Sequence, residues 1–362
     1  MNTKKLKRMM RQKTSKKKKG LSRINALSTG STLLNLACTD TTWAGFMCGH
    51  FYFLVGDSIS GKTFLSLTCF AEASINKHFH NHRLIFDNVE GGALMDIRRF
   101  FGKGVFERME PPTKKKGVAV YSSTIEEFYF NVEGAIQDGR PFIYVLDSMD
   151  SLSSKDEADK FKKSRDAHHK GKEISGSFGD GKAKKNSANL RRLLTPLSKS
   201  GSILIIINQT RDNLGFGFEK KARSGGRALR FYSCIELWSS VIGKIKKMVK
   251  GKPRQLGIKC KIQIKKNRIV GKEREIIIPI YHSLGIDDVG SCVDYLIDEG
   301  HWSKNKKGKI TATEFDFCDG YEKLIKHITS NDMEKDLIDI VDEVWHEIED
   351  ACVVKNRKKR YE

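Results

Sequence analysis

Short apolar runs rich in β-branched and aromatic residues alternate along the chain with polar or helix-forming stretches of a dozen or more residues. The runs lack the strict apolar-polar alternation of strands that have one exposed face. Strands covered by helices on both faces have this pattern, so we expect an α/β fold with a mostly parallel sheet. The predicted strands span residues 51–55, 84–86, 118–121, 142–146 and 203–207.

Two helices have local sequence signatures. Thr124 is followed three residues later by Glu127, which is a capping box and predicts that a helix begins there. Near the C-terminus, apolar residues recur at spacings of four, three and four, which predicts an amphipathic helix packed on one face. These apolar residues are Leu337, Val341, Val344 and Ile348.

The length and the polar segments suggest how the chain is divided. With 362 residues, it can form one large domain and a smaller one, since domains hold roughly 100–200 residues. We expect a basic flexible arm over 1–26, a large α/β core over 27–284, and a small α+β domain with a basic tail over 285–362. Two long polar segments, 153–187 and 211–226, interrupt the core, and loops of this length are usually functional or disordered.

The charge balance favours a polyanionic partner. Lys and Arg total 66 against 44 Asp and Glu, a formal net charge of +22. Such a positive field attracts nucleic acid or acidic lipid, and charge alone does not choose between them, nor does it exclude a soluble protein from a lysine-rich proteome. The basic arm is open to three interpretations: a solvated tail, an address signal or a DNA contact.

Other features of the composition limit the class of protein. No apolar run approaches the ~20 residues that span a bilayer, and the first residues lack the apolar core of a secretory signal. We therefore expect a cytoplasmic or nucleoid-associated protein that has no membrane partner. The eight cysteines are scattered without the close pairs of zinc or redox motifs, which predicts reduced, mostly structural thiols.

A phosphate-binding loop is the strongest chemical motif. The spacing Gly-x4-Gly-Lys-Thr falls between a predicted strand and a helix-forming stretch, which is the context such a loop requires. Glycines let backbone N–H groups converge on phosphate oxygens, and the following helix presents its positive end. The predicted nucleotide-binding residues are Gly56, Asp57, Ser58, Ile59, Ser60, Gly61, Lys62 and Thr63.

Acidic residues at strand ends complete the predicted chemistry. Lys62 would neutralise the β- and γ-phosphates of ATP, while Thr63 and Asp147, at the end of a predicted strand, would hold Mg²⁺. An Asp at this position can also simply cap a turn. Glu90 is the predicted base for the attacking water, with Asp87 as the alternative, and a solvated loop acid is the competing interpretation.

In order along the chain, these motifs resemble the RecA recombinases of bacteria and their phages, from about residue 27 to 346. The most specific part of the resemblance is a strand ending in Asn-Gln-Thr-Arg, followed by a loop and then Gly-Gly-Arg-Ala-Leu-Arg-Phe-Tyr-Ser. The motifs that carry it are residues 27–37, Asp147-Ser148, 206–211, 225–233 and 295–308. The resemblance implies a P-loop NTPase core with two DNA-binding loops, the segments 153–187 and 211–226.

The resemblance also implies roles for individual residues. Gln209 is similar to the family residue that senses the γ-phosphate and couples it to DNA, although an amide at a strand end can also be purely structural. Lys266 and Arg268 match cations that reach a neighbouring subunit's ATP, and a solvated charge run is the alternative. The implied DNA-binding residues are Arg223, Gly225, Gly226 and Arg227, with Lys182, Lys184 and Lys185 as weaker candidates.

The resemblance as a whole implies a recombinase with DNA-dependent ATPase activity that requires ATP and Mg²⁺. Such a protein assembles into a helical filament on single-stranded DNA. The filament then pairs this strand with double-stranded DNA for recombination and repair. The alternatives are a ring-forming helicase on the same core and an accessory protein that uses ATP only as a switch for annealing. Four departures from the family pattern fit a divergent phage or mobile-element member. Glu90 comes one residue late, the N-terminal linking helix is replaced by lysines, the first loop is unusually basic, and the C-terminal tail is basic.

Overall fold

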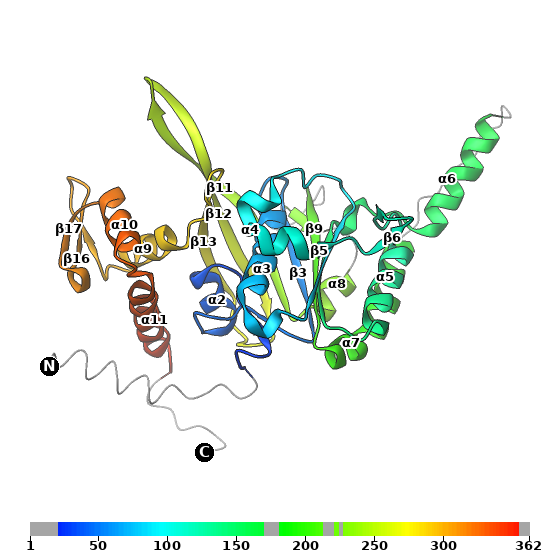
Figure 1. The fold of residues 1–362 in the computed structure, drawn as a ribbon, viewed down its shortest axis with the longest axis horizontal. Helices are drawn as coiled ribbons and strands as arrows, with labels where there is room; N and C mark the ends of the chain where they lie inside the picture. The colour runs from blue at the N-terminus through cyan, green and yellow to red at the C-terminus, as the bar shows by residue number, and fades with distance from the viewer. Residues whose placement is uncertain (1–20, 170–180, 213–220, 224–226, 355–362) are drawn as a thin grey trace, which may run out of the picture.

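A computed structural model describes residues 21–169, 181–212, 221–223 and 227–354 (Figure 1). The basic segment 1–20 and the basic tail from 355 lie outside the described residues, so the predictions about these segments remain predictions. Residues 21–26 of the predicted arm are described, and Ala26 is buried in a short strand. Within the described ranges the chain forms a large central sheet between two layers of helices, and the C-terminal elements lie beyond one end of the sheet (Figure 1).

The central sheet has ten strands with parallel pairing in its middle. Its pairs are parallel from β11 through β3, β9, β8 and β4 to β5, and antiparallel from β11 outward to β14. A short strand, β10, pairs antiparallel with β9. The strands in sheet order are β14 (Gly285–Ile286), β13 (Arg274–Tyr281), β12 (Lys252–Asn267), β11 (Ile235–Val249), β3 (His50–Gly56), β9 (Ile203–Asp212), β8 (Phe142–Asp147), β4 (Arg83–Asn88) and β5 (Met109–Glu110), with β10 at Lys221–Arg223.

Both faces of the parallel part of this sheet are buried, which explains why its strands β3, β8 and β4 lack alternation. Along β3, Tyr52 and Leu54 belong to one hydrophobic core, whereas Phe51, Phe53 and Val55 belong to the other. The predicted α/β fold with a mostly parallel sheet is therefore confirmed. The first core contains residues of α2 (Thr32–Thr39), α3 (Lys62–Ile75) and α4 (Ile97–Arg108), and the second contains residues of α5 (Ile125–Gln137), α7 (Gly181–Ser200) and α8 (Arg227–Tyr232).

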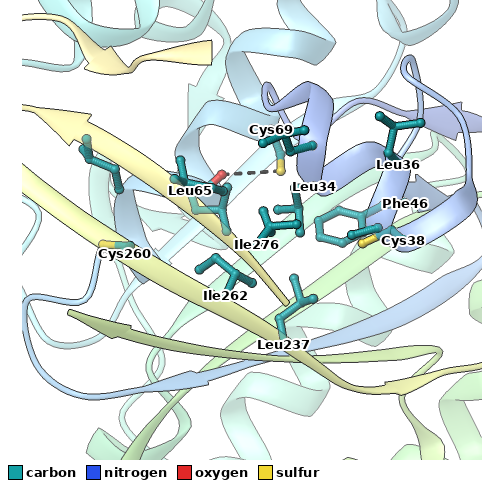
Figure 2. Packing of buried hydrophobic residues seen from close by; sticks show 14 of the residues in the cluster. Leu34, Leu36, Cys38, Phe46, Leu65, Cys69, Leu237, Cys260, Ile262 and Ile276 are labelled. Atoms are coloured by element: carbon teal, nitrogen blue, oxygen red, sulfur yellow. Dashed lines mark hydrogen bonds between the residues drawn. The ribbon is translucent and has the colours of Figure 1, made fainter. Parts of the chain in front are cut away.

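Figure 2 shows how the first core joins helices to the antiparallel strands. Leu34 of α2 and Leu65 of α3 lie against Leu237, Ile262 and Ile276, which come from β11, β12 and β13. All five side chains are nearly or completely buried. Since a large aliphatic side chain contributes roughly 1.5–3 kcal/mol when fully buried, this contact holds the first helices on the antiparallel half of the sheet.

The smaller elements complete the fold. The predicted capping box is confirmed, because the Thr124 hydroxyl accepts from the Glu127 amide and the Glu127 carboxylate accepts from the Thr124 amide. The remaining elements are β1 (Ala26–Leu27), β2 (Phe46–Met47), η1 (Lys77–Phe79), β6 (Thr113–Lys115), β7 (Val118–Val120), η2 (Met149–Ser151), α6 (Lys155–His168), α9 (Asp288–Asp298), β15 (Ser303–Lys304), β16 (Lys309–Ala312), η3 (Thr313–Phe315), β17 (Phe317–Gly320), α10 (Tyr321–Ser330) and α11 (Glu334–Ala351).

Two predictions about local structure are wrong. The run 118–121 is no strand of the central sheet: β7 pairs antiparallel with β6 in a separate hairpin, and Val118 is exposed. The segment 153–187 contains α6 and the start of α7 where a loop was expected. Because α6 projects from the body with few apolar residues, its sequence lacks the periodicity that marks a packed helix (Figure 1).

The C-terminal elements pack on the first core. In α11, Leu337, Val341 and Val344 are buried and Ile348 is partly buried, as the predicted amphipathic helix requires. The contacts of α9 reach both α11 and β13, and its buried residues belong to the same cluster as the helices of the main core. The boundary at residue 285, which divides an independent domain from the core, stays a prediction.

A buried cation joins three distant segments at this end of the sheet. Arg274 of β13 forms ion pairs with Asp40, at the end of α2, and with Glu349 of α11, at 2.5 and 2.6 Å. The guanidinium also lies over the Trp345 ring, 4.9 Å from its centroid. Removing one partner of a buried pair typically costs 3–5 kcal/mol, so this junction fixes α11 against the core.

Two further predictions concern composition. Within the described ranges, no helix is both long and apolar enough to cross a bilayer. All eight cysteines are described and all are free, five of them buried.

Candidate active site

The phosphate loop connects β3 to α3 and depends on two glycines. A side chain at Gly56 would place its Cβ 2.2 Å from the main-chain oxygen of Ser239, on the neighbouring strand β11. Gly61 has a φ of +81°, a conformation that residues with a Cβ rarely adopt. The sheet thus brings the loop so close to β11 that only glycine fits at its start, and Ser239 Oγ fixes the loop by donating to Ser60 O at 2.5 Å.

Lys62, the first residue of α3, is buried and points back over the loop. Its Nζ donates to Gly56 O at 2.9 Å and to Asp57 O at 2.5 Å. Burial lowers the pKa of Lys62, while the charges of Asp147, Glu90, Asp57 and Asp150 oppose that shift. One ammonium group therefore lies among several carboxylates at the carboxyl edge of the sheet.

Thr63 and Asp147 are directly bonded to each other. The Thr63 hydroxyl donates to Asp147 Oδ2 at 2.6 Å, which joins the start of α3 to the end of β8. Asp147 is 5% exposed, and this burial raises its pKa, while the bond from Thr63 acts in the opposite direction. Two hard oxygen donors side by side, at the mouth of a phosphate loop, have the chemistry that Mg²⁺ prefers.

Glu90 and Gln209 meet across the ends of two strands. Gln209 lies beside Gly56 in the β3–β9 register, and its Nε2 donates to Glu90 Oε1 at 2.9 Å. The same carboxylate oxygen accepts from the hydroxyls of Ser148 and Ser151, the latter at 3.1 Å. The structure therefore brings together five of the residues singled out in the sequence, namely Lys62, Thr63, Glu90, Asp147 and Gln209.

Asp87 lies away from this cluster, inside the second core. It has no exposed surface, and its carboxylate accepts from the Ser122 amide at 3.0 Å, the Ser122 hydroxyl at 2.6 Å and the Tyr144 hydroxyl at 2.7 Å. Burial raises the pKa of Asp87, and the Ser122 bonds oppose the shift. These three donors occupy both of its oxygens, whereas Glu90 is at the edge of the sheet.

Sequence reasoning missed three polar residues at the site. Asp150 Oδ2 accepts from the main-chain N–H of Gln209 at 2.5 Å, and the hydroxyl of Thr210 donates to Asp57 Oδ1. Ser239 supports the loop from β11. Asp150 follows Asp147 by three residues, and this spacing is the only local sequence signal for any of the three. The positions of Thr210 and Ser239 depend on which strands are neighbours in the sheet.

Lys266 and Arg268 are near the end of α8 in their own chain. Lys266 Nζ donates to the carbonyls of Arg230, Phe231 and Ser233 at 2.5–2.8 Å, and Arg268 Nη2 donates to Phe231 O at 2.7 Å. Burial, together with the charge of Arg268, lowers the pKa of Lys266 to about 8. Both cations cap the negative end of this helix, and their predicted role toward a neighbouring subunit stays a prediction.

The predicted DNA-binding residues are only partly described. Arg223 lies in β10, opposite Thr210 of β9, and Arg227 begins α8 with an exposed side chain. Gly225 and Gly226 lie outside the described residues. Of the weaker candidates, Lys185 is paired with Glu126 and Asp156, Lys182 donates to Leu152 O at 2.6 Å, and Lys184 is exposed.

Comparison with known proteins agrees with this geometry. Residues 142–287 match the family model of the RecA N-terminal domain. That range holds Asp147, Gln209, Lys266 and Arg268 and begins after the phosphate loop. The chain is 28% identical to Protein RecA of Chlorobaculum parvum over 292 residues (76% of this chain and 71% of that protein).

Two further relatives give the same result. Identity is 28% over 284 residues with Protein RecA of Cytophaga hutchinsonii (76% of this chain, 70% of that protein). It is 28% over 292 residues with Protein RecA of Thermus aquaticus (76% and 73%). The motifs, the sheet and these similarities agree with one another: the chain is similar to RecA proteins over 76% of its length and diverges from them in sequence.

Proposed function

We propose that this protein is a DNA-dependent ATPase that forms a filament on single-stranded DNA and carries out homologous pairing and strand exchange. The observation that carries the proposal is the Gln209–Glu90 hydrogen bond of 2.9 Å. Gln209 is on β9, and the last two residues of β9 begin the segment 211–226 that resembles a DNA-binding loop. One side chain thus connects the proposed nucleotide site to the proposed DNA site.

ATP and Mg²⁺ fit the residues at the loop. Lys62 would exchange its two carbonyl acceptors for β- and γ-phosphate oxygens, while Thr63 and Asp147 would become ligands of Mg²⁺. A triphosphate in an acid-rich site needs a divalent cation to screen like charges, and the bound ion would neutralise the charge that develops on the phosphates. The loop residues from Gly56 to Thr63 would surround those phosphates.

Glu90 is the residue best suited to orient and deprotonate the attacking water. Its carboxylate is close enough to Lys62 to affect the lysine's pKa, and its Oε1 is fixed by three donors, from Ser148, Ser151 and Gln209. A fixed carboxylate can accept a proton in a defined direction. Asp87 is saturated by its own donors, so we propose Glu90 for this role.

Gln209 would transmit the state of the nucleotide to DNA. Its side-chain amide can move from Glu90 to a γ-phosphate oxygen, since an amide both donates and accepts. Such a move would pull the end of β9, which precedes the proposed DNA contacts at Arg223, Gly225, Gly226 and Arg227. Backbone amides and cations there would bind phosphates and leave the bases free to pair.

Lys266 and Arg268 would complete the site in trans. In a head-to-tail filament each ATP lies at a subunit interface, where these cations would stabilise the negative charge. In the isolated subunit they are bonded to carbonyls at the end of α8. Assembly would therefore have to replace those bonds, which offers a reason for turnover to depend on assembly.

The test is an ATPase assay with and without single-stranded DNA, together with electron microscopy of the same mixtures. We expect DNA to stimulate turnover and to support helical filaments. A protein that shows neither would overturn the proposal. Unwinding of forked DNA by rings would favour the helicase, and annealing that persists in Glu90→Gln without turnover would favour the accessory protein.

A further inference from the structure

The long hairpin formed by β11 and β12 extends well past the sheet. Its strand β11 pairs with β3 only over residues 235–239, and β12 pairs with β13 only over 257–264. Between these limits the two strands pair only with each other, up to a turn at Lys250 and Gly251. Figure 1 shows this free part, called here the ribbon (residues 240–256), standing clear of the helices.

The ribbon carries positive charge without compensation. It contains six cations within eleven residues and no Asp or Glu. All six side chains are exposed, and none of them forms an ion pair with another described residue. The six are Lys244, Lys246, Lys247, Lys250, Lys252 and Arg254.

The register places cations on both faces of the ribbon. Residues directly opposite each other share a face, and successive residues alternate. Lys247 is opposite Arg254, and Lys252 lies two residues before Arg254, so these three share one face. Lys246 is opposite Gln255 and shares the other face with Lys244. A partner that neutralises all of them must surround the ribbon, which a flat surface cannot do.

Such a projection needs a reason, since an isolated two-stranded hairpin is at best marginally stable in water. Lysines on an exposed edge can simply prevent strands from pairing with other molecules. Prevention of strand pairing would account for some of the lysines. It does not account for a ribbon that extends into solvent and has only positive charges.

We propose that the ribbon is a docking arm for double-stranded DNA, separate from the nucleotide site. The major groove, about 12 Å wide, admits a two-stranded ribbon and has phosphates along both walls. Cations on both faces match that geometry. Membrane-surface segments typically carry Trp, Tyr or Phe, and residues 240–256 contain none of these.

The experiment measures binding of the full-length protein to a fluorescent blunt duplex without nucleotide, over a range of salt concentrations. The test variant is K246Q/K247Q/K252Q/R254Q. The control K103Q/K114Q/K115Q/K116Q also removes four exposed cations, three of them from the short β6–β7 hairpin. Circular dichroism and thermal melting check that both variants fold.

We expect the ribbon variant to lose about 10- to 100-fold in duplex affinity at low salt, with its salt slope reduced by about 3, as loss of three or four phosphate contacts predicts. The control should stay within about threefold of the wild type. The charge-preserving variant K246R/K247R/K252R should bind like the wild type.

Three results would overturn the proposal. The first is an equal loss of duplex affinity in the two glutamine variants, and the second is an unchanged duplex affinity in the ribbon variant. The third is a ribbon variant that loses binding to anionic lipid vesicles but keeps its binding to duplex. The proposed ATPase is tested separately: if the ribbon variant keeps turnover stimulated by single-stranded DNA while losing duplex, the ribbon and the nucleotide site are independent. If stimulation is absent in the wild type but duplex binding follows the expected pattern, only the proposed function fails.

Discussion

The nucleotide site and the β11–β12 ribbon handle charge in opposite ways. At the site, Lys62 is buried among carboxylates, Thr63 is hydrogen-bonded to Asp147, and Gln209 is hydrogen-bonded to Glu90. On the ribbon, six cations are exposed and unpaired within the described structure. The first arrangement suits one compact ligand in one geometry, whereas the second suits a long polyanion in many registers.

This difference teaches where each kind of effect should appear. A buried charge interacts through a low dielectric, so replacing one side chain has a large and salt-insensitive effect. An exposed cation contributes little alone, and its effect is screened by salt.

Lys62→Ala should have the largest effect. Loss of the ammonium proposed to neutralise the phosphates should lower ATP turnover by on the order of 10³-fold, the scale seen for a buried electrostatic group. Duplex binding by the ribbon should be unchanged. Steady-state ATPase rates and duplex titrations measure the two, and a variant that loses both together would show that the two regions are not separate.

Glu90→Gln should lower turnover by on the order of 10²-fold with little change in melting temperature, because it removes only the proposed base. The matched change Asp87→Asn should lower the stability of the fold and leave ATP turnover almost unchanged. Its amide would face donors from Ser122 and Tyr144, at a cost of about 1–3 kcal/mol in the free energy of unfolding. Rates and urea melts on both variants separate the roles; catalytic loss confined to Asp87→Asn would reverse the assignment.

The sequence predicted which side chains meet at the carboxyl edge of the sheet better than it predicted the surrounding structure. Lys62, Thr63 and Asp147 are adjacent to strand ends, where the parallel arrangement brings them together, so local pattern was enough. The strand assignment at 118–121 failed because a short apolar run is also compatible with a hairpin outside the sheet, as β7 is. The edge strand β5 (Met109–Glu110) has only two residues and gave no periodic signal.

Other parts of the site could not be predicted because they depend on tertiary neighbours. The partners of Lys266 are main-chain carbonyls at the end of α8, and a carbonyl has no sequence signature. The approach of Ser239 to Gly56 follows from the pairing of β11 with β3. The sequence pattern does not predict helix α6, because the helix has almost no apolar face and even its Phe161 is exposed.

Asp288 is a buried carboxylate outside both the nucleotide site and the ribbon. Asp288 accepts from the Thr32 amide and hydroxyl at 2.7 and 2.6 Å, and burial raises its pKa to about 6. The folded state therefore holds a proton that the unfolded chain releases near pH 4, and the free energy of unfolding should fall as pH rises from about 4 to about 6. Above that window the loss should be constant.

Asp288→Asn should remove this dependence. An amide can accept from the Thr32 N–H and donate to its hydroxyl, without a buried charge. We expect the variant to be about 1–3 kcal/mol more stable than the wild type at pH 7, and equal to it near pH 4. Urea unfolding at several pH values measures this, and a variant that is less stable at pH 7 would show that the charged form is favoured.

The substitutions in the ribbon should have the smallest effect, and the quantity measured is ATP turnover. The variant K246Q/K247Q/K252Q/R254Q should keep its DNA-free ATP turnover within about twofold of the wild type, since exposed charges far from the site are screened by salt. A larger change that persists at high salt would mean that the ribbon and the nucleotide site are coupled.

The central claim is that Gln209 connects nucleotide to DNA. The measurement that tests it most directly is the ratio of ATP turnover with and without single-stranded DNA, in the wild type and in Gln209→Ala. We predict stimulation of about tenfold or more in the wild type, a typical coupling between sites. In the variant the ratio should fall to near one, with the DNA-free rate and DNA binding retained. Equal stimulation in the two proteins would contradict the account.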